Sequence, residues 1–245
     1  MDFHNHFLKA GSMTLRTNEF GQPIGPAMSG WTPRQQPAGV TLTGRFCQLE
    51  PVDPARHAAD LFAAYSGAPQ GWTYMAAGPF ASEADFRAHA EAIAASTDPR
   101  HYAVTDLKTG KAVGTLSLMR IDPNNGVIEV GNVMFSPLLQ RTPLSTEAQY
   151  LLMAYAFDAL GYRRYEWKCD ALNAPSRRTA GRLGFTFEGI FRQAVIYKGR
   201  SRDTAWFSII DKEWPQLKTA FEAWLDNGNF HADGSQKQPL QALRG

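Results

Sequence analysis

The chain has 245 residues, and 44% of them are hydrophobic, which is enough to bury the core of one large domain. Its 25 basic and 23 acidic side chains nearly cancel, whereas dedicated nucleic-acid-binding proteins carry a strong basic excess. No run of about 18 apolar residues could span a membrane, and two cysteines are too few for a disulfide framework. We therefore expect a cytoplasmic protein that uses no metal and binds neither nucleic acid nor membranes.

The two ends of the chain differ in composition from its middle. Residues 12–40 contain eight glycines and prolines, too many for regular structure, and this segment is expected to wrap on the domain or to form a flexible tail. The last residues are polar and rich in glycine and glutamine, which predicts a frayed end. The expected organisation is an N-terminal arm (1–39), one domain (40–227) and a C-terminal tail (228–245).

Apolar periodicity and turn residues predict alternating strands and helices between the two ends. The predicted strands are Val40–Val52, Tyr102–Leu107, Ala112–Ile121, Val127–Phe135, Tyr165–Ala171, Phe185–Tyr197 and Thr204–Ile210. The predicted helices are Ala55–Tyr65, Glu83–Ala95, Ser145–Leu160, Pro175–Leu183 and Glu213–Leu225. The turns between the second, third and fourth strands are too short for parallel crossovers, so the fold class is α+β with a mixed sheet.

The segment Leu139–Ala148 leads from a predicted strand into a predicted helix. The start of a helix presents free backbone N–H groups and the positive end of the helix dipole, and both attract phosphate. Further donors would be the guanidinium of Arg141 and the hydroxyls of Thr142, Ser145 and Thr146. Helix capping alone would also explain these hydroxyl residues. Arg177, Arg178 and Arg182 form a second basic patch that suits an anionic ligand.

Three separated motifs resemble the GNAT superfamily of acetyltransferases, in particular its ribosomal-protein N-terminal acetyltransferase branch. They are Glu129-Val-Gly131 followed by Gln140 to Ala148, then Asn173-Ala-Pro-Ser176, and finally Gly184-Phe185. The resemblance covers about residues 40–212. It implies a three-layer α/β/α sandwich with a mixed, mostly antiparallel seven-stranded sheet, and an enzyme that transfers the acetyl group of acetyl-CoA to a primary amine.

The resemblance also assigns residues to the cofactor. It places the phosphates on the loop from Gln140 to Thr146, the pantetheine arm along Asn173 and Ser176, and a cofactor-binding cation at Arg178. A backbone N–H near Met134 and Phe135 would stabilise the oxyanion. The family's loop glycines are replaced here by Arg141 and Pro143, so the loop must approach the phosphates by another path.

For catalysis, the resemblance points to Glu129 as the base that takes a proton from the ammonium group of the acceptor. A structurally paired glutamate in a strand is the alternative. Many relatives protonate the leaving sulfur with a tyrosine at the position of Ala180, so here Ser176 or water would replace that acid, or the thiolate would leave unassisted. The altered loop and the missing tyrosine raise a second hypothesis, an acyl-CoA-binding protein without catalysis.

The acceptor pocket is expected near the aromatic segment that includes Trp72, Tyr74 and Phe80. Core packing is the alternative for these rings. The acceptor would be a small amine or a peptide N-terminus, with a slight preference for a small or short acceptor. The sequence leaves the oligomeric state open, with a homodimer as one option.

Overall fold

The computed structural model describes residues 16–244, which belong to two compact units that divide between Thr32 and Pro33. In the first unit, β1 (Arg16–Thr17) pairs with β2 (Pro23–Ile24) in an antiparallel hairpin. The second unit contains every other described helix and strand. Among residues 16–244, no helix has both the length and the apolar character that crossing a membrane requires.

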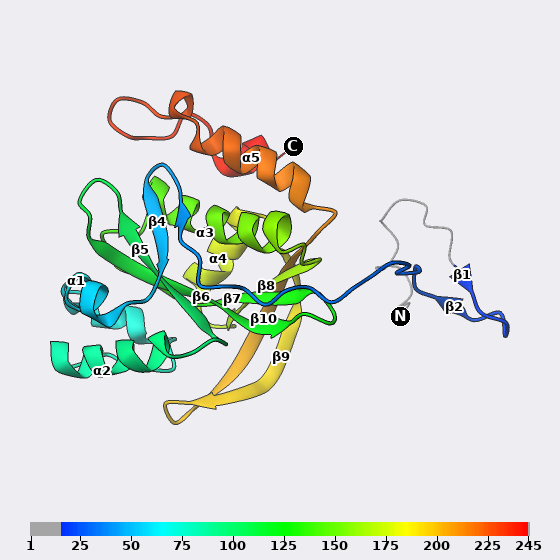
Figure 1. Cartoon of the computed structure of the whole chain (residues 1–245), viewed down its shortest axis with the longest axis horizontal. Helices are drawn as coiled ribbons and strands as arrows, with labels where there is room; N and C mark the ends of the chain where they lie inside the picture. Colours follow the sequence, from blue (N-terminus) through cyan, green and yellow to red (C-terminus); the bar gives the residue numbers. More distant parts are fainter. Residues whose placement is uncertain (1–15, 245) are drawn as a thin grey trace. The chain divides into compact units, whose positions relative to one another are not determined.

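The second unit is built on an eight-stranded sheet with the order β3-β4-β5-β6-β7-β8-β10-β9 (Figure 1). Its strands are β3 (Leu42–Thr43), β4 (Cys47–Pro51), β5 (Arg100–Asp106), β6 (Ala112–Asp122), β7 (Val127–Phe135), β8 (Arg164–Asp170), β9 (Thr186–Tyr197) and β10 (Arg200–Ile210). All neighbours are antiparallel except β7 and β8, which are parallel. The predicted α+β class with a mixed, mostly antiparallel sheet is confirmed.

The sheet has one strand more than predicted, because the expected strand Val40–Val52 is broken into β3 and β4. The carboxylate of Glu147, buried in α3 (Pro143–Ala154), accepts three backbone N–H groups of residues 45–47 at 2.6–2.8 Å. A side chain on Gly44 would collide with that carboxylate. The turn is therefore fixed by a residue about one hundred positions further along the chain.

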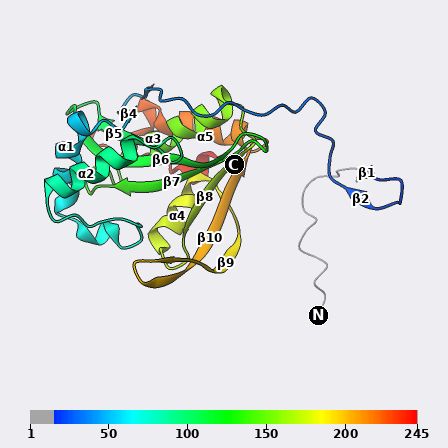
Figure 2. The same cartoon turned by 60° about the horizontal axis from the view of Figure 1, so that its bottom comes forward.

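Helices cover both faces of the sheet (Figures 1 and 2). On one face, α1 (Pro54–Ser66) and α2 (Glu83–Ala94) enclose a smaller core with β5 and β6. On the other face, α3, α4 (Ala174–Leu183) and α5 (Trp214–Leu225) enclose the larger core. The predicted helix Ser145–Leu160 is α3 followed by a π-helical turn, Tyr155–Ala159.

The parallel pair in the middle of the sheet is short. Pairing between β7 and β8 extends from Val127↔Arg164 to Val130↔Trp167 and stops there, although β7 continues to Phe135. Beyond Val130, where β7 no longer pairs with β8, its pairing with β6 contains a bulge. Within this bulge Asn132 has a left-handed φ of 49°. Backbone groups on this edge of β7 consequently have no strand partner, and the sheet opens at this point.

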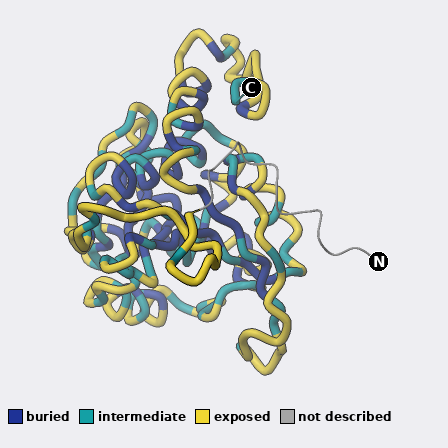
Figure 3. Tube along the Cα trace, turned by 90° about the vertical axis from the view of Figure 1, so that its right-hand side faces the viewer, coloured by how far each residue is buried: buried dark blue, intermediate teal, exposed yellow. Residues whose placement is uncertain are grey.

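The segment from residue 228 to residue 244 packs on the domain, whereas the sequence predicted a frayed end. It begins within a 3₁₀ turn at Asn227–Asn229 and contains a second one at Leu240–Leu243. Leu240 is fully buried in the larger core, and Figure 3 shows buried positions close to the C-terminus. Most side chains of this segment are polar and face solvent, so its composition did not indicate the few apolar residues that pack on the core, Phe230, Leu240 and Leu243.

Candidate functional site

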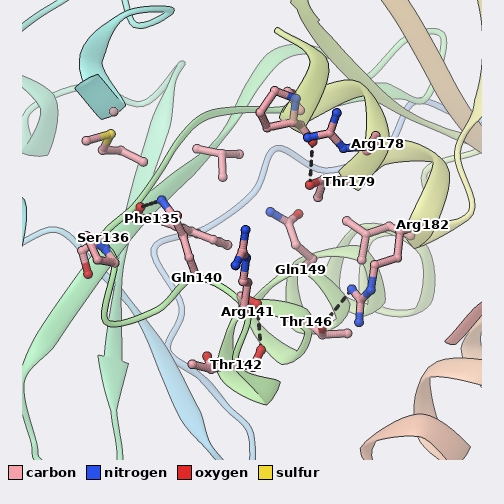
Figure 4. Close-up of a pocket in the computed structure, with 18 of the residues that line it drawn as sticks. Phe135, Ser136, Gln140, Arg141, Thr142, Thr146, Gln149, Arg178, Thr179 and Arg182 are labelled. Atoms are coloured by element: carbon pink, nitrogen blue, oxygen red, sulfur yellow. Dashed lines mark hydrogen bonds between the residues drawn. The ribbon is translucent and has the colours of Figure 1, made fainter. Parts of the chain in front are cut away.

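A cavity of about 950 Å³ opens where β7 and β8 part. Its walls come from the end of β7, the first turns of α3, the cavity-facing side of α4, the loop after α1 and the C-terminal segment. The lining includes three arginines, Arg141, Arg178 and Arg182, while no described aspartate or glutamate belongs to it (Figure 4). Because three cations face the same space without a counter-charge on its walls, the cavity suits a ligand with several negative charges.

The loop between β7 and α3 exposes backbone donors to this cavity. Arg141 adopts the left-handed conformation, with φ at 61°, at a position where the family pattern has glycine in its loop. No acceptor among the described residues bonds the backbone N–H of Arg141 or of Thr142. Pro143 then opens α3, whose first turn carries the positive end of its dipole. The loop therefore reaches a glycine-like geometry with an arginine.

The loop hydroxyls have other partners. Thr142 Oγ1 donates to Leu139 O at 2.7 Å, and Ser145 Oγ donates to Thr142 O at 2.8 Å. Thr146 Oγ1 accepts from Arg182 at 3.0 Å. Gln140 Nε2 donates to Phe135 O at 2.7 Å and so fastens the loop to the end of β7. Hydrogen bonds to a phosphate would thus come mainly from backbone N–H groups and guanidinium groups.

Two buried polar side chains of the cavity wall have no hydrogen-bond partner among the described residues. Gln149 on α3 is 1% exposed, and both atoms of its amide group are unpaired. The hydroxyl of Ser136, just after β7, is also buried and unpaired. An unsatisfied buried polar group costs about 1–3 kcal/mol, so both groups are explained if a ligand or ordered water completes their bonding. Gln149 was not singled out from the sequence, where a polar residue within a helix has no special meaning.

The start of α4 forms the opposite wall. Asn173 caps this helix, with its Oδ1 accepting from Ser176 N at 3.2 Å. Ser176 Oγ accepts from Trp167 Nε1 at 3.0 Å, which leaves the hydroxyl hydrogen of Ser176 available to another acceptor. Ala180, where many relatives of the resembled family have a tyrosine, is fully buried. Ser176 is therefore the hydroxyl that α4 contributes to the cavity near β8.

The structure brings the predicted cofactor residues together. All ten line the cavity: Met134, Phe135, Gln140, Arg141, Thr142, Ser145, Thr146, Asn173, Ser176 and Arg178. They come from β7, the following loop, α3 and α4, which are separated by up to 44 residues in sequence and meet at the opening between β7 and β8. Their roles toward a ligand stay predictions.

The structure does not place Glu129 on the cavity wall. Its side chain is buried on β7, where its Oε2 lies 2.8 Å from Lys168 Nζ and 3.4 Å from Arg120 Nε. Lys168 also binds Glu166 at 2.6 Å. Burial raises the pKa of Glu129, and the nearby Lys168 opposes that rise. This geometry matches the alternative of a structurally paired glutamate, and the role of base stays a prediction.

The three predicted acceptor residues separate into two groups. Tyr74 lines the cavity, and its hydroxyl donates to Leu172 O at 3.2 Å. Trp72 is only 5% exposed and packs edge-on against Tyr65 and Phe80, at ring distances of 5.4 and 5.3 Å. Trp72 and Phe80 thus belong to the smaller core and not to the cavity wall. Packing, the alternative weighed from the sequence, explains both rings.

The β9–β10 hairpin holds the loop that carries Tyr74. Lys198 Nζ donates to the carbonyls of Trp72 and Gly78, at 2.9 and 2.6 Å, and Arg200 donates to Thr73 O at 2.6 Å. These two residues lie about 120 positions from the loop and carry no motif, so the sequence did not indicate them. This end of the cavity is lined by uncharged groups: Tyr65, Ala68, Gln70, Gly71, Tyr74 and Met134.

Comparisons with known proteins agree with these observations. Residues 47–186 match the family model "Acetyltransferase (GNAT) domain". A crystal structure of a GCN5-related N-acetyltransferase from Brucella melitensis is 50% identical, with a TM-score of 0.87, and the match covers 89% of this chain and 99% of that one. A GNAT-family structure from Chromobacterium violaceum is 40% identical, with a TM-score of 0.74 and coverage of 79% and 98%. A Bacillus licheniformis N-acetyltransferase named p20 is 27% identical over 64% of this chain and 89% of its own length.

Proposed function

Because the chain belongs to the acetyltransferase (GNAT) domain family, we propose that this acetyltransferase uses acetyl-CoA to acetylate a primary amine. The observation that carries the proposal is the cavity at the opening between β7 and β8, with three arginines and no described carboxylate on its walls. CoA carries a pyrophosphate and a 3′-phosphate, so its charge complements this lining. The unpaired amide of Gln149 and hydroxyl of Ser136 would complete their hydrogen bonds with such a ligand.

Different residues of the chain would bind different parts of acetyl-CoA. Arg141 and the free N–H groups at the start of α3 would hold phosphate, in the way helix N-termini bind anions. The unpaired edge of β7 from Gly131 to Phe135 offers backbone groups to the extended pantetheine arm and to the thioester. Ser176 lies on the opposite wall at the start of α4. Acetyl-CoA itself supplies the activated acetyl group.

The chemistry then requires three things from the protein. The acceptor amine must lose a proton before its nitrogen attacks the thioester carbon, and Glu129 is our proposal for the base. A backbone N–H near Met134 would stabilise the oxyanion that forms. As the carbon–sulfur bond breaks, the hydroxyl of Ser176 would donate its hydrogen to the thiolate. Direct attack in a ternary complex needs both substrates in one continuous cavity.

The acceptor enters, in this proposal, at the uncharged end of the cavity beside Tyr74 and Gln70. None of the described lining residues is a carboxylate that could pair with a second positive charge on the acceptor. This favours amines whose neighbouring groups are neutral, either small molecules or a peptide N-terminus. A Bacillus subtilis (strain 168) relative, 29% identical over 44% of this chain and 58% of its own length, carries a name that assigns it provisionally to ribosomal N-acetyltransferases. It supports including peptides among the acceptors.

A thiol-release assay tests the proposal. The full chain is incubated with acetyl-CoA and a panel of amines: neutral monoamines, diamines, amino acid amides and short peptides. We expect CoA release with neutral monoamines or peptides and little release with diamines. A protein that binds CoA in calorimetry but releases no thiol with any acceptor would be an acyl-CoA-binding protein without catalysis. Absence of CoA binding would overturn the proposal.

A further inference from the structure

The C-terminal segment contributes a wall to the cavity, beyond the part of the chain that the family model matches. Phe230, Gly234, Ser235 and Gln236 line the cavity together with Trp224 at the end of α5. We call residues 230–236 the C-terminal loop. The lining here differs from the rest, because two aromatic rings lie beside an arginine and an amide side chain.

The C-terminal loop is held in place by a network of its own. The buried Asn229 donates to Trp224 O and Gln238 O, at 3.0 and 3.2 Å, and accepts from Gln238 N at 2.9 Å. Gln236 and Phe230 form an isolated antiparallel β-bridge, and Gln236 Oε1 accepts from Trp224 Nε1 at 2.8 Å. Such a network holds the wall in a single shape.

Arg182 connects this wall to the start of α3. Its guanidinium donates to Thr146 at 3.0 Å and lies 5.1 Å above the ring of Trp224. The ring of Phe230 packs edge-on against Trp224, with 5.2 Å between centroids. The cavity thus continues from the phosphate-binding loop, past Arg182, to the aromatic wall. Figure 4 shows Arg182 and Thr146 at one side of the cavity and Arg141 near its centre.

The order of these parts decides which portion of the ligand reaches the C-terminal loop. The thioester must lie at the opening of β7, where an amine can enter beside Tyr74, and the pyrophosphate lies at Arg141. What extends beyond the pyrophosphate of CoA is adenosine with its 3′-phosphate. Aromatic side chains and an amide suit a purine, and an arginine suits a phosphate.

We propose that the C-terminal loop, with Trp224 and Arg182, forms the subsite for the adenosine 3′-phosphate half of CoA. This inference rests on the proposed use of acetyl-CoA and adds a preference to it. The chain would bind acyl groups carried on free CoA and reject acyl groups carried on phosphopantetheine alone, as on a carrier protein.

Calorimetry on the full chain, with CoA, 3′-dephospho-CoA and 4′-phosphopantetheine as probes, tests the subsite. We expect the wild type to bind CoA more tightly than phosphopantetheine. Phe230→Ala should weaken CoA binding by about tenfold, the scale of one lost base–aromatic contact, and leave phosphopantetheine binding unchanged. Arg182→Met should remove the difference between CoA and 3′-dephospho-CoA.

Two further variants keep the test decisive if Phe230→Ala unfolds the loop. Ser235→Trp places a large side chain at an exposed lining position, so the fold should tolerate it while CoA binding weakens. Lys237→Ala alters an exposed neighbour that is not part of the lining, and should behave as wild type. Equal wild-type affinity for CoA and phosphopantetheine, unchanged CoA affinity in Phe230→Ala and Ser235→Trp, or equal losses for both ligands would overturn the inference. A wild type that binds neither ligand would instead overturn the proposed function.

Discussion

At the α3 end of the cavity, three arginines and the free N–H groups of a helix start face the interior, whereas the α1 end presents only uncharged groups. Both ends belong to one continuous space that opens between β7 and β8. A charged wall binds its ligand through electrostatic attraction, which tolerates some change in ligand shape. An uncharged wall must distinguish ligands through fit and through individual hydrogen bonds. We infer that the α3 end determines affinity for the cofactor and that the α1 end determines which amine is used.

The largest expected effect is a loss of turnover in Glu129→Gln. No described carboxylate lines the α1 end, so the proposed base, Glu129, would act from outside the lining. The substitution should reduce turnover by about 10²–10⁴-fold, the usual contribution of a positioned base. Because burial raises the pKa of Glu129, the carboxylate becomes an active base only at a higher pH than an ordinary glutamate. The wild-type rate should therefore rise with pH through that raised pKa, and the variant should lack this limb. The defect should grow with pH through this pKa and shrink again at a pH where the amine is already neutral without a base.

Glu166→Gln is the matched control for this prediction. Glu166 is buried beside Glu129 and binds the same Lys168 amine. A role of Glu129 as base predicts a much smaller loss of turnover in Glu166→Gln. Equal losses of turnover in the two variants would show that the effect comes from the broken ion pairs. Normal turnover in Glu129→Gln would show that solvent, and not Glu129, takes the proton from the acceptor amine.

The second prediction separates packing from binding at the α1 end. Trp72→Ala should lower the free energy of unfolding by about 3–5 kcal/mol, as expected for a large aromatic side chain removed from a core. Tyr74→Ala should change the stability far less, because Tyr74 is only half-buried on the cavity wall. Urea unfolding followed by fluorescence measures both. If Trp72→Ala has normal stability and a raised amine KM, Trp72 is part of the acceptor pocket and not of the core.

The third prediction concerns the charge at the α3 end. Arg141→Gly removes the charged side chain and keeps the left-handed backbone without strain, whereas Arg141→Ala would leave a Cβ in that conformation. The loss of a charge-assisted contact of about 1.5–3 kcal/mol should weaken CoA binding by roughly 10- to 150-fold in calorimetry. Arg192→Ala removes an equal charge from exposed β9, outside the lining, and serves as the control. Unchanged affinity in Arg141→Gly would remove this residue from the site.

The smallest effect is expected for the hydroxyl of Tyr74. Tyr74→Phe removes the hydrogen bond to Leu172 O and keeps the ring, which costs about 0.5–1.5 kcal/mol. The amine KM should rise several-fold while the acetyl-CoA KM stays constant, because only the α1 end is altered. Tyr150→Phe deletes a comparable hydroxyl, bonded to Glu222 outside the cavity, and should leave both KM values unchanged. A rise in the acetyl-CoA KM of Tyr74→Phe would contradict the division between the two ends.

Local signals in the sequence were sufficient for most of the fold. Apolar periodicity and the short turns between β5, β6 and β7 act over a few residues, so the sequence alone indicated the α+β class and the antiparallel strands. The candidate phosphate-binding loop could also be predicted from the sequence, because the donors at a helix start are contiguous. These features depend on neighbours within one or two turns of chain.

What remained hidden depends on contacts between distant residues. The break between β3 and β4 is set by Glu147, and the loop that carries Trp72 and Tyr74 is held by Lys198 and Arg200, about 120 positions away. The pairing of Glu129 with Lys168 joins two strands that meet only in the sheet. Whether a buried polar side chain lies beside an opposite charge, as Glu129 does beside Lys168, or has no partner, like the amide of Gln149, depends on what lies opposite it in space. Only the tertiary structure decides this, because burial and partner are properties of the packed chain and not of the residue type.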